Sequence, residues 1–523
     1  MHCVIGSGPA GVACAKALLA RGARVLMLDA GIELETDRAQ NVRQLAQTKP
    51  ASWTAPQLNA LKGDLTVTAK GLSLKKVFGS DFPYRETKAG IPWRGNGIGL
   101  QPSLALGGFS NVWGAAMLPH RDEDMADWPV NNADLAPHYR AAAQITGLAG
   151  QHDDLEELFP LHCDAPGVLS ASRQANLLLG NLQPHREFLR SRGWRFGRAR
   201  VAVRATDTPR GPGCIHCGLC MHGCVYGCIY NSADTVRELG ADKNFTYQRD
   251  VVVTALRETE GKVFITGHHR ETRAPLAFEA DRVYLAVGVI STAQILLRSE
   301  KAYDRPLILR DSQYFLFPLL LARRTRNVQS EALYTLSQIF IELANPRVSR
   351  RPVHLQLYTY SDLIGQAVRK SLGPLKMFAG PLEERMIIVQ GYLHSDESRT
   401  MAMTLKRDDE NDVLEIEAQP NPETRRVVKK VLGELLRQAR RLGGVVVPPL
   451  LQLTEPGRGF HSGGSLPMRT RPGPFETDRL GCPHGWTRVH AVDASVLPTI
   501  PATTITFTVM ANAHRIGWET AMR

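Results

Sequence analysis

Five of the nine cysteines of the chain fall between residues 214 and 228, at a spacing that could bind a metal centre. Their pattern is C-x2-C-x2-C-x3-C-x3-C, and its first four members have the spacing of a bacterial ferredoxin run, with Val225 where proline is usual. Thiolates spaced in this way can wrap a 4Fe–4S cluster, and four of them could instead bind zinc. A thiol-rich loop without metal is the third alternative. The candidate ligands are Cys214, Cys217, Cys220, Cys224 and Cys228.

The identity of the fourth ligand of such a cluster stays open. In ferredoxins with two clusters, the fourth cysteine of the run binds the other cluster. A single cluster would therefore need Cys224 or Cys228 from the run, or one of the distant Cys163 and Cys482. A cluster passes electrons one at a time, so its presence would imply a separate electron acceptor, either a protein or a quinone, in place of oxygen.

A glycine-rich turn near the start of the chain predicts a dinucleotide site. A short apolar strand leads into Gly6-x-Gly8-x-x-Gly11, and a helical pattern follows. Gly6 permits the tight turn, Gly8 lets the backbone approach a pyrophosphate, and Gly11 lets helix and strand pack closely. A second apolar strand ends at Asp29, whose carboxylate could accept hydrogen bonds from a ribose. The helix N-terminus offers N–H groups and a positive dipole to phosphate.

Four further segments resemble the glucose–methanol–choline (GMC) oxidoreductase family. Residues 107–114 (GGFSNVWG) are similar to the family's loop over the flavin, residues 127–139 to its WP…ADLEPYY segment, and residues 284–299 to its ILAAGAIGTPQLLLLS segment. The strongest match is residues 489–501 (VHAVDASVLPTIP), which resemble the family's RVHGVDASVFPTIP. The resemblance covers both ends and several middle segments of the chain. It implies that the dinucleotide is FAD.

The resemblance also implies roles for individual residues. Ser110, Asn111 and Trp113 fall in the loop that lies over the flavin in the family. Asp493 and Ala494 fall where the family's aspartate and its neighbour meet the ribityl and pyrophosphate region. Together with the glycines and the acidic residue of the dinucleotide motif, these five are the predicted cofactor-binding residues.

The family oxidises alcohols by proton abstraction and hydride transfer to the flavin, which requires a base within reach of the hydroxyl. Its active-site histidine lies in H-x-x-GT-x-x-MG, and residues 459–468 (GFHSGGSLPM) match that segment, with Ser465 where the family has threonine. His461 is therefore the candidate base, because an imidazole that is neutral near pH 7 suits this role. The alternative is a structural histidine.

A second family position departs from the pattern. The family has a histidine or asparagine near the flavin in a segment such as NPTLT, and the matching stretch here begins at Thr504, with a shift of one residue still open. A threonine hydroxyl is a weaker electrostatic partner for an alkoxide. This departure leaves two alternatives: a non-catalytic electron carrier with flavin and cluster, or a redox-neutral flavin enzyme that works with a protein partner.

The length of the chain predicts two joined domains, because 523 residues are too many for one simple core. The expected fold class is α/β plus α+β, with a Rossmann-type FAD-binding domain and a second, mixed-sheet substrate domain. The FAD-binding domain is expected at residues 1–310, with a cysteine-rich insert at 205–232, and again at 445–523. The substrate domain is expected at residues 311–444, which contain several strand-like segments.

Composition limits the partners. The chain has 63 Lys+Arg against 51 Asp+Glu, a net charge of +12, but it has no long polybasic run and no nucleic-acid motif. No stretch reaches the roughly 20 apolar residues of a membrane span. The N-terminal apolar run carries the glycine motif and is not read as a signal peptide, so a cytoplasmic protein is expected. The apolar residues 314–322 and the basic residues of 311–375 raise the prospect of a peripheral membrane contact.

These observations predict an FAD-dependent dehydrogenase of GMC type, in preference to an oxidase. Its substrate would be a small molecule with a hydroxyl group, either sugar-like or an apolar alcohol. Hydride would pass to the flavin, with His461 as base and Thr504 as its partner. If the cysteines hold a 4Fe–4S cluster, electrons would leave through it to an acceptor protein or a quinone.

Overall fold

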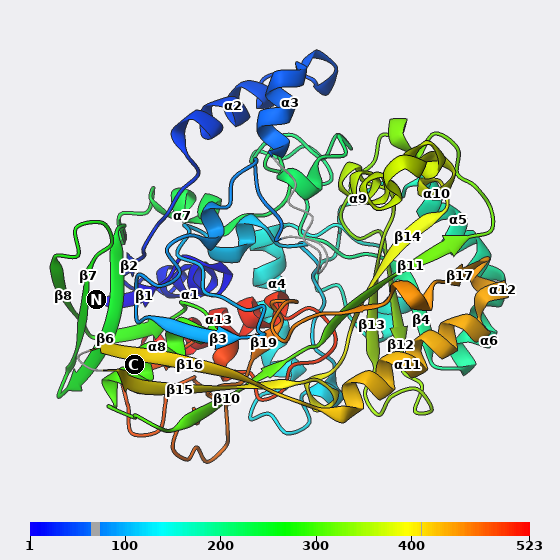
Figure 1. Ribbon diagram of the computed structural model, residues 1–523. Helices are drawn as coiled ribbons and strands as arrows, with labels where there is room; N and C mark the ends of the chain where they lie inside the picture. The colour runs from blue at the N-terminus through cyan, green and yellow to red at the C-terminus, as the bar shows by residue number, and fades with distance from the viewer. Residues whose placement is uncertain (64–73, 409–410, 523) are drawn as a thin grey trace.

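The computed structural model describes residues 1–63, 74–408 and 411–522. Within these ranges, the strands form four sheets with helices packed around them (Figure 1). The two termini lie close together in Figure 1, beside the same sheet. No helix among the described residues is long and apolar enough to cross a membrane.

A parallel sheet joins the two ends of the chain. Its strand order is β20-β9-β1-β2-β5. The strands are β1 (His2–Ile5), β2 (Val25–Leu28), β5 (Phe245–Gln248), β9 (Arg282–Leu285) and β20 (Val489–Ala491). Helices α1 (Pro9–Ala20) and α13 (Thr506–Thr520) pack against each other beside this sheet. The prediction of a Rossmann-type domain formed by both ends of the chain is confirmed.

Two glycines allow the tight packing at the centre of this domain. Gly6 has a φ of +101°, and a Cβ placed there would lie 2.6 Å from the carbonyl oxygen of Ala286, at the end of β9. A Cβ on Gly11 would overlap the carbonyl oxygen of Gly6. Both clashes are with backbone, which cannot move aside as a flexible side chain can. The positive φ of Gly6 agrees with its predicted role in the tight turn, and the contact of Gly11 agrees with its predicted role in packing helix against strand.

A large antiparallel sheet forms one wall of the molecule. Its order is β17-β11-β14-β13-β12-β4, and β18 also pairs with β11. The strands are β4 (Trp194–Arg198), β11 (Tyr314–Leu321), β12 (Ile339–Leu343), β13 (Val353–Tyr358), β14 (Met386–Tyr392), β17 (Gly444–Val446) and β18 (Gln452–Leu453). One face packs against α5 (Arg173–Leu182) and α11 (Pro422–Arg437) in a closed apolar core.

The remaining strands form two smaller sheets. The mixed sheet contains β3 (Trp93–Asn96), β10 (Pro306–Asp311), β15 (Thr400–Asp408), β16 (Asn411–Gln419) and β19 (Ser462–Gly463). The other is an antiparallel sheet of β6 (Val251–Thr259), β7 (Lys262–His269) and β8 (Pro275–Ala280). Strands β4 and β3 lie outside residues 311–444 but pair with strands inside that range. The sheets thus cross the predicted domain boundaries, which stay predictions.

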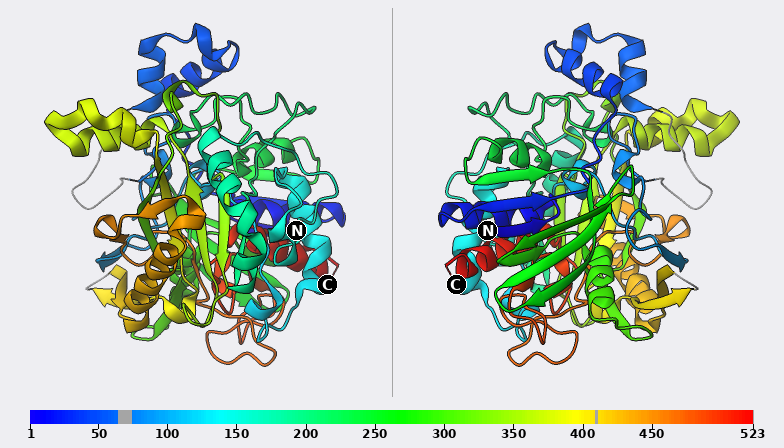
Figure 2. Two further views of the ribbon diagram at one scale, coloured as in Figure 1. Left: turned by 90° about the vertical axis from the view of Figure 1, so that its right-hand side faces the viewer. Right: turned by 90° about the vertical axis from the view of Figure 1, so that its left-hand side faces the viewer.

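Further helices cover the sheets or extend from them. They are α2 (Thr36–Ala46), α3 (Ala55–Lys62), α4 (Asn132–Thr146), α6 (Arg186–Ser191), α7 (Ser232–Leu239), α8 (Val289–Ser299), α9 (Asp362–Leu372), α10 (Ala379–Glu383) and α12 (Ala439–Leu442). In Figure 2, α2 and α3 (blue) project from the body, and so does the pair formed by α9 and α10 (yellow-green).

The Gly11→Ala substitution is expected to destabilise the fold, because the added methyl group would collide with the Gly6 carbonyl oxygen and separate helix from strand. Overpacking of this kind costs about 1–3 kcal/mol or more. Gly8→Ala is the matched control, since a Cβ at Gly8 meets nothing within 4 Å. Thermal unfolding of the two variants tests this expectation. Equal stability of both variants would contradict the packing role of Gly11.

Candidate active site

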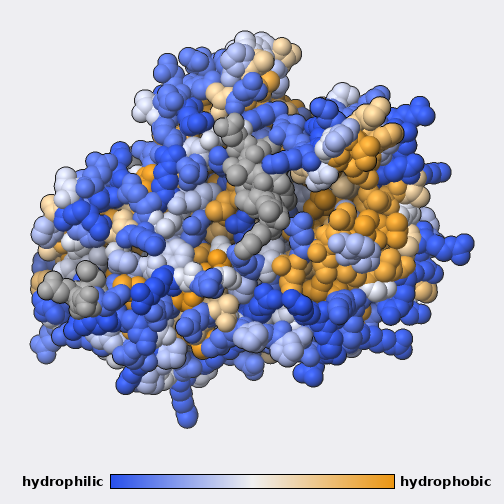
Figure 3. Space-filling view, viewed as in Figure 1, coloured by the Kyte–Doolittle hydropathy of each residue, from blue (hydrophilic) through white to orange (hydrophobic). Residues whose placement is uncertain are grey.

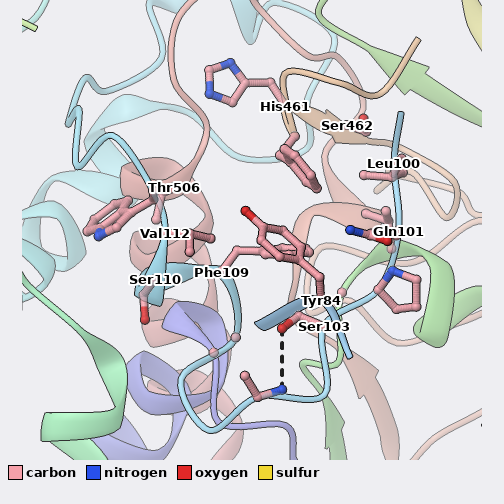
Figure 4. A pocket seen from close by; sticks show the side chains of 18 of the residues that line it. Tyr84, Leu100, Gln101, Ser103, Phe109, Ser110, Val112, His461, Ser462 and Thr506 are labelled. Atoms are coloured by element: carbon pink, nitrogen blue, oxygen red, sulfur yellow. Dashed lines mark hydrogen bonds between the residues drawn. The ribbon is translucent and has the colours of Figure 1, made fainter. Parts of the chain in front are cut away.

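A large cavity of about 1470 Å³ lies where the parallel sheet meets the antiparallel wall. It is lined by the glycine turn after β1, the end of β2, strand β6, the start of α8 and the wall strands β11, β13 and β14. Figure 4 shows side chains from further segments around it, with His461 and Thr506 on one side and Leu100 and Gln101 on the other. Segments distant in sequence therefore share one space.

The glycine turn presents open backbone to this cavity. Gly8 caps α1 without any side-chain hydrogen bond, and the first turn of α1 carries no acidic residue. The first turn of α8 also lines the cavity, beginning at Gly288 with a φ of +82°. Two helix N-termini therefore contribute to one cavity, and both favour negative charge there. Together with the open space beside Gly8, this arrangement fits a dinucleotide pyrophosphate.

Ser7 links the dinucleotide motif to the loop at 107–114. Its hydroxyl donates to the Asp29 carboxylate at 2.5 Å and accepts from the Gly107 N–H at 2.9 Å. The Tyr247 hydroxyl also donates to Asp29, at 3.2 Å. Burial raises the pKa of Asp29 to about 6, although these hydrogen bonds act in the opposite direction. Asp29 therefore stays largely ionised at pH 7 and lies on the cavity wall, as its predicted contact with ribose requires.

The structure separates the three residues predicted in the loop at 107–114. Ser110 and Trp113 line the cavity, whereas Asn111 does not. The Asn111 amide group donates to the carbonyl oxygens of Leu106 and Gly108, and its oxygen accepts from the side chain of Asn231. Asn111 is therefore placed to hold the loop against the start of α7. Its predicted contact with the cofactor stays a prediction.

Ser110 also holds this loop in place. Its hydroxyl donates to the Gly107 carbonyl oxygen at 2.6 Å and accepts from the Ser232 N–H at 3.0 Å. Trp113 is fixed through its indole N–H, which donates to the Tyr230 carbonyl oxygen at 2.9 Å. The loop therefore reaches the cavity with its polar groups already satisfied, and its shape does not depend on a ligand.

Asp493 ties the C-terminal segment to α8. One carboxylate oxygen accepts from the Gly288 N–H at 2.9 Å and from the Thr292 hydroxyl at 2.6 Å. The other oxygen accepts from the Ser495 N–H at 2.9 Å, at the start of η12 (Ala494–Val496). Both Asp493 and Ala494 line the cavity. Asp493 therefore aligns two helix starts along one side of it.

His461 borders the cavity on the opposite side from the glycine turn, as part of the segment between the wall and the C-terminus. Its ring stacks on Tyr392, with the centroids 4.7 Å apart, and its Nδ1 is buried without a hydrogen-bond partner. Burial lowers the pKa of His461 to about 3, and the nearby His354 acts in the same direction. The imidazole is therefore neutral at physiological pH.

Two threonines border the cavity at or near the predicted partner position. Thr504 is buried and accepts a hydrogen bond from the Leu118 N–H at 3.3 Å. Thr506, at the first residue of α13, also lines the cavity and is visible in Figure 4. A shift of one residue from Thr504 would reach Thr503 or Ile505, so Thr506 lies outside the predicted register although it borders the same cavity.

No sequence motif indicated the cavity wall that is formed by β11, β13 and β14. Tyr314, Tyr358 and Tyr392 line the cavity together with Gln356 and Gln390, all from β11, β13 and β14. Behind Tyr392 lies His354, which is fully buried and bonded to Glu342. These residues lie in ordinary strand patterns, and the only available signal was their polar type within strands that are otherwise apolar.

All five cysteines of the run line a second, small cavity of about 20 Å³. Cys163 and Cys482 do not line it, and the Cys482 thiol instead donates to the Trp486 carbonyl oxygen. Leu336 lines both this cavity and the large one, so a single side chain separates them at that point. Among the described residues, no three His, Cys, Asp or Glu side chains are grouped to hold a metal ion.

Comparison with known proteins gives one curated relative. No protein-family model matches the chain. The chain is 26% identical over 322 residues to 6'''-hydroxyparomomycin C oxidase of Streptomyces lividus, a match that covers 58% of this chain and 50% of that protein. The chain thus spans about half the length of the curated relative it matches.

Solved structures match over nearly the whole chain. Pyridoxine 4-oxidase from Mesorbium loti superposes with a TM-score of 0.62 at 14% identity, covering 100% of this chain and 99% of that one. Formate oxidase of Aspergillus oryzae RIB40 superposes with a TM-score of 0.59 at 13% identity, covering 99% and 97%. Both are GMC oxidoreductases. The chain therefore resembles the glucose–methanol–choline oxidoreductases in its motifs and has their fold.

Proposed function

We propose that the protein is an FAD-dependent oxidoreductase that oxidises a hydroxyl group of a small molecule, with His461 as the base. The observation that carries this proposal is the position of a neutral, unpaired imidazole on the same cavity as a dinucleotide cradle. The names of the curated relative and of both structural neighbours are those of oxidases, which supports the reaction class.

The residues of the cavity fit FAD. The backbone at Gly8 and the starts of α1 and α8 would hold the pyrophosphate, and Asp29 would accept from the ribose. Ser110, Trp113 and Ala494 lie where they can border the rest of the cofactor. Bound FAD would supply the acceptor for the hydride that leaves the alcohol carbon. The chain itself must orient the alcohol and receive its proton.

A proton acceptor must be held in place and must be neutral, and His461 meets these two requirements without a partner residue. The ring is held in place by the stacked Tyr392, and burial keeps it neutral. A general base works best with a pKa near the operating pH, so the pKa of His461 must rise from about 3 when substrate binds for the ring to accept the proton. The hydroxyls of Thr504 and Thr506 offer hydrogen bonds to the developing alkoxide. The tyrosine and glutamine side chains of β11, β13 and β14 could help to orient the substrate.

Substitution of His461 by Ala is expected to lower kcat by a factor of about 10² to 10⁴, the usual contribution of a positioned general base. Bound flavin should remain, since His461 is not part of the predicted cofactor cradle. His152→Ala is the control, because His152 is an exposed residue outside the cavity. Rates measured on a panel of alcohols and sugars decide the matter, and a His461→Ala enzyme as fast as the control would remove His461 as the base.

The pH profile gives a separate expectation. A folded pKa of about 3 leaves His461 neutral throughout the range above pH 4, so its protonation cannot reduce activity near pH 6.5. kcat/KM of the loaded enzyme should therefore show no acidic limb near the ordinary histidine pKa. A limb near pH 6.5 that disappears in His461→Asn would contradict the burial argument.

We also propose that the five-cysteine cavity is a metal centre, of the 4Fe–4S type in preference to zinc. All five thiols converge on one cavity. Among the described residues, no three His, Cys, Asp or Glu side chains are grouped to hold a metal ion, so the preference for a cluster over zinc rests on the ferredoxin-like spacing of the cysteines. The cavity as described has room for about one water, so the thiol side chains would have to rotate outward on binding.

The electron acceptor follows from this second proposal. A cluster one side chain away from the flavin cavity would pass electrons to an acceptor protein or a quinone, which makes the enzyme a dehydrogenase. The oxidase names of the relatives favour oxygen instead. No observation favours a non-catalytic or redox-neutral flavin protein.

Protein purified without oxygen should contain about four iron and four acid-labile sulfide per chain if the cluster is present. Cys217→Ser should reduce both, whereas Cys482→Ser should leave both unchanged because Cys482 lies outside the cavity. Iron-free protein with intact flavin would refute the cluster and leave oxygen as the expected acceptor.

A further inference from the structure

The apolar lining of the large cavity continues to the surface of the molecule. Along β11, Phe315 and Phe317 belong to the closed core, whereas Leu316 faces the cavity. Farther along the same strand, Leu320 is only half-buried, under α9 and α10. Figure 3 shows the result as a broad hydrophobic area over β11, β14 and β17, which reaches the region of α9 and α10.

The segment between α9 and α10 exposes large apolar side chains. It is η9 (Gly373–Phe378), in which Leu375 is 57% exposed, Met377 78% and Phe378 59%. We call these three residues, together with the exposed Lys376 among them, the apolar tip. Figure 2 shows that the α9–α10 pair stands out from the body, so the tip is convex. Such clustering of exposed apolar side chains usually marks a binding surface.

The charge around the tip is basic. The last turn of α9 carries Arg369 and Lys370, and Lys376 lies within the tip itself. Arg369 pairs with the buried Glu383, whereas Lys376 is exposed within the tip. The whole chain also has a net charge of +12. Basic residues beside exposed apolar ones are the combination that binds the surface of an anionic bilayer.

Helix α9, which directly precedes the apolar tip, also borders the cavity. Leu363, in the first turn of α9, lines the cavity, and Asp362 beside it bonds to Lys62 of α3 at 2.6 Å. Leu451 and Leu453 also line the cavity, next to Leu450, which is 58% exposed. In both segments, apolar residues of the cavity wall are therefore close in sequence to exposed apolar residues.

We propose that the apolar tip docks the protein on an anionic lipid bilayer and that its substrate is an apolar alcohol drawn from that bilayer. The substrate half of this inference rests on the proposed function, and the docking half does not. A bilayer suits the tip better than a second copy of the chain, because a convex projection inserts among headgroups but does not form a flat, self-complementary interface.

Flotation of the purified full-length chain with vesicles tests the docking. The vesicles are phosphatidylcholine alone, or phosphatidylcholine mixed with phosphatidylglycerol. Wild-type protein should float with the anionic vesicles, and salt should weaken the binding. The double variant Met377→Ser/Phe378→Ser should bind more than roughly tenfold more weakly, because two exposed apolar side chains are lost. Lys376→Gln should bind about fivefold more weakly.

Matched controls test whether the loss of binding is specific to the apolar tip or follows from removing any exposed apolar or basic side chain. Val168 is 58% exposed outside the tip, so Val168→Ser should bind as wild type does. Lys243→Gln removes an exposed lysine outside the tip and should also have no effect. Wild-type protein that ignores anionic vesicles would overturn the docking. So would tip variants that float normally, or that lose self-association in sedimentation in place of lipid binding.

Activity separates the substrate half from the proposed function. The double variant should oxidise a short, water-soluble alcohol at the wild-type rate but a long-chain alcohol held in vesicles several-fold more slowly. If the double variant oxidised both alcohols at the wild-type rate, the bilayer could not be the source of the substrate. If wild-type protein oxidised neither alcohol, the proposed function would fail, and the flotation result would still decide the docking.

Discussion

The contact between the glycine turn and the end of β9 is the constraint on which the rest of the structure depends. Gly6 lies against the Ala286 carbonyl oxygen, and Gly11 lies against Gly6, so the first strand and helix can meet only without side chains there. This contact places the starts of α1 and α8 on the same cavity. A side chain at Gly6 or Gly11 would push the strand and the helix apart and disturb the site for phosphate.

Buried hydrogen bonds extend this arrangement outward. Ser7 joins the turn to Asp29 and to the loop at 107–114, and Asp493 joins α8 to the C-terminal segment. Each bond links segments that are far apart in sequence, so the cavity is assembled by the fold before any ligand binds. The cost of burying these polar groups is offset because almost every one has a partner.

Much of this could be predicted from the sequence. The dinucleotide turn, Asp29 and the C-terminal Asp493 segment were recognisable because their chemistry requires particular residues at fixed spacing. The antiparallel wall was not, since Tyr392, Gln356 and Gln390 are scattered over strands that pair only in three dimensions. Asn111 shows the opposite case: its segment matched, but its side chain holds the loop and does not reach the cavity. The tip at Leu375–Phe378 carries no motif, and only its exposure distinguishes it.

The most direct test of the central claim is the identity and amount of the cofactor in the purified chain. The account predicts an equimolar amount of FAD, released on denaturation, and bleaching of the bound flavin when a hydroxyl substrate is added without oxygen. A chain that binds no FAD even after reconstitution, or that binds NAD in its place, would contradict the account, because the cavity would then have another purpose.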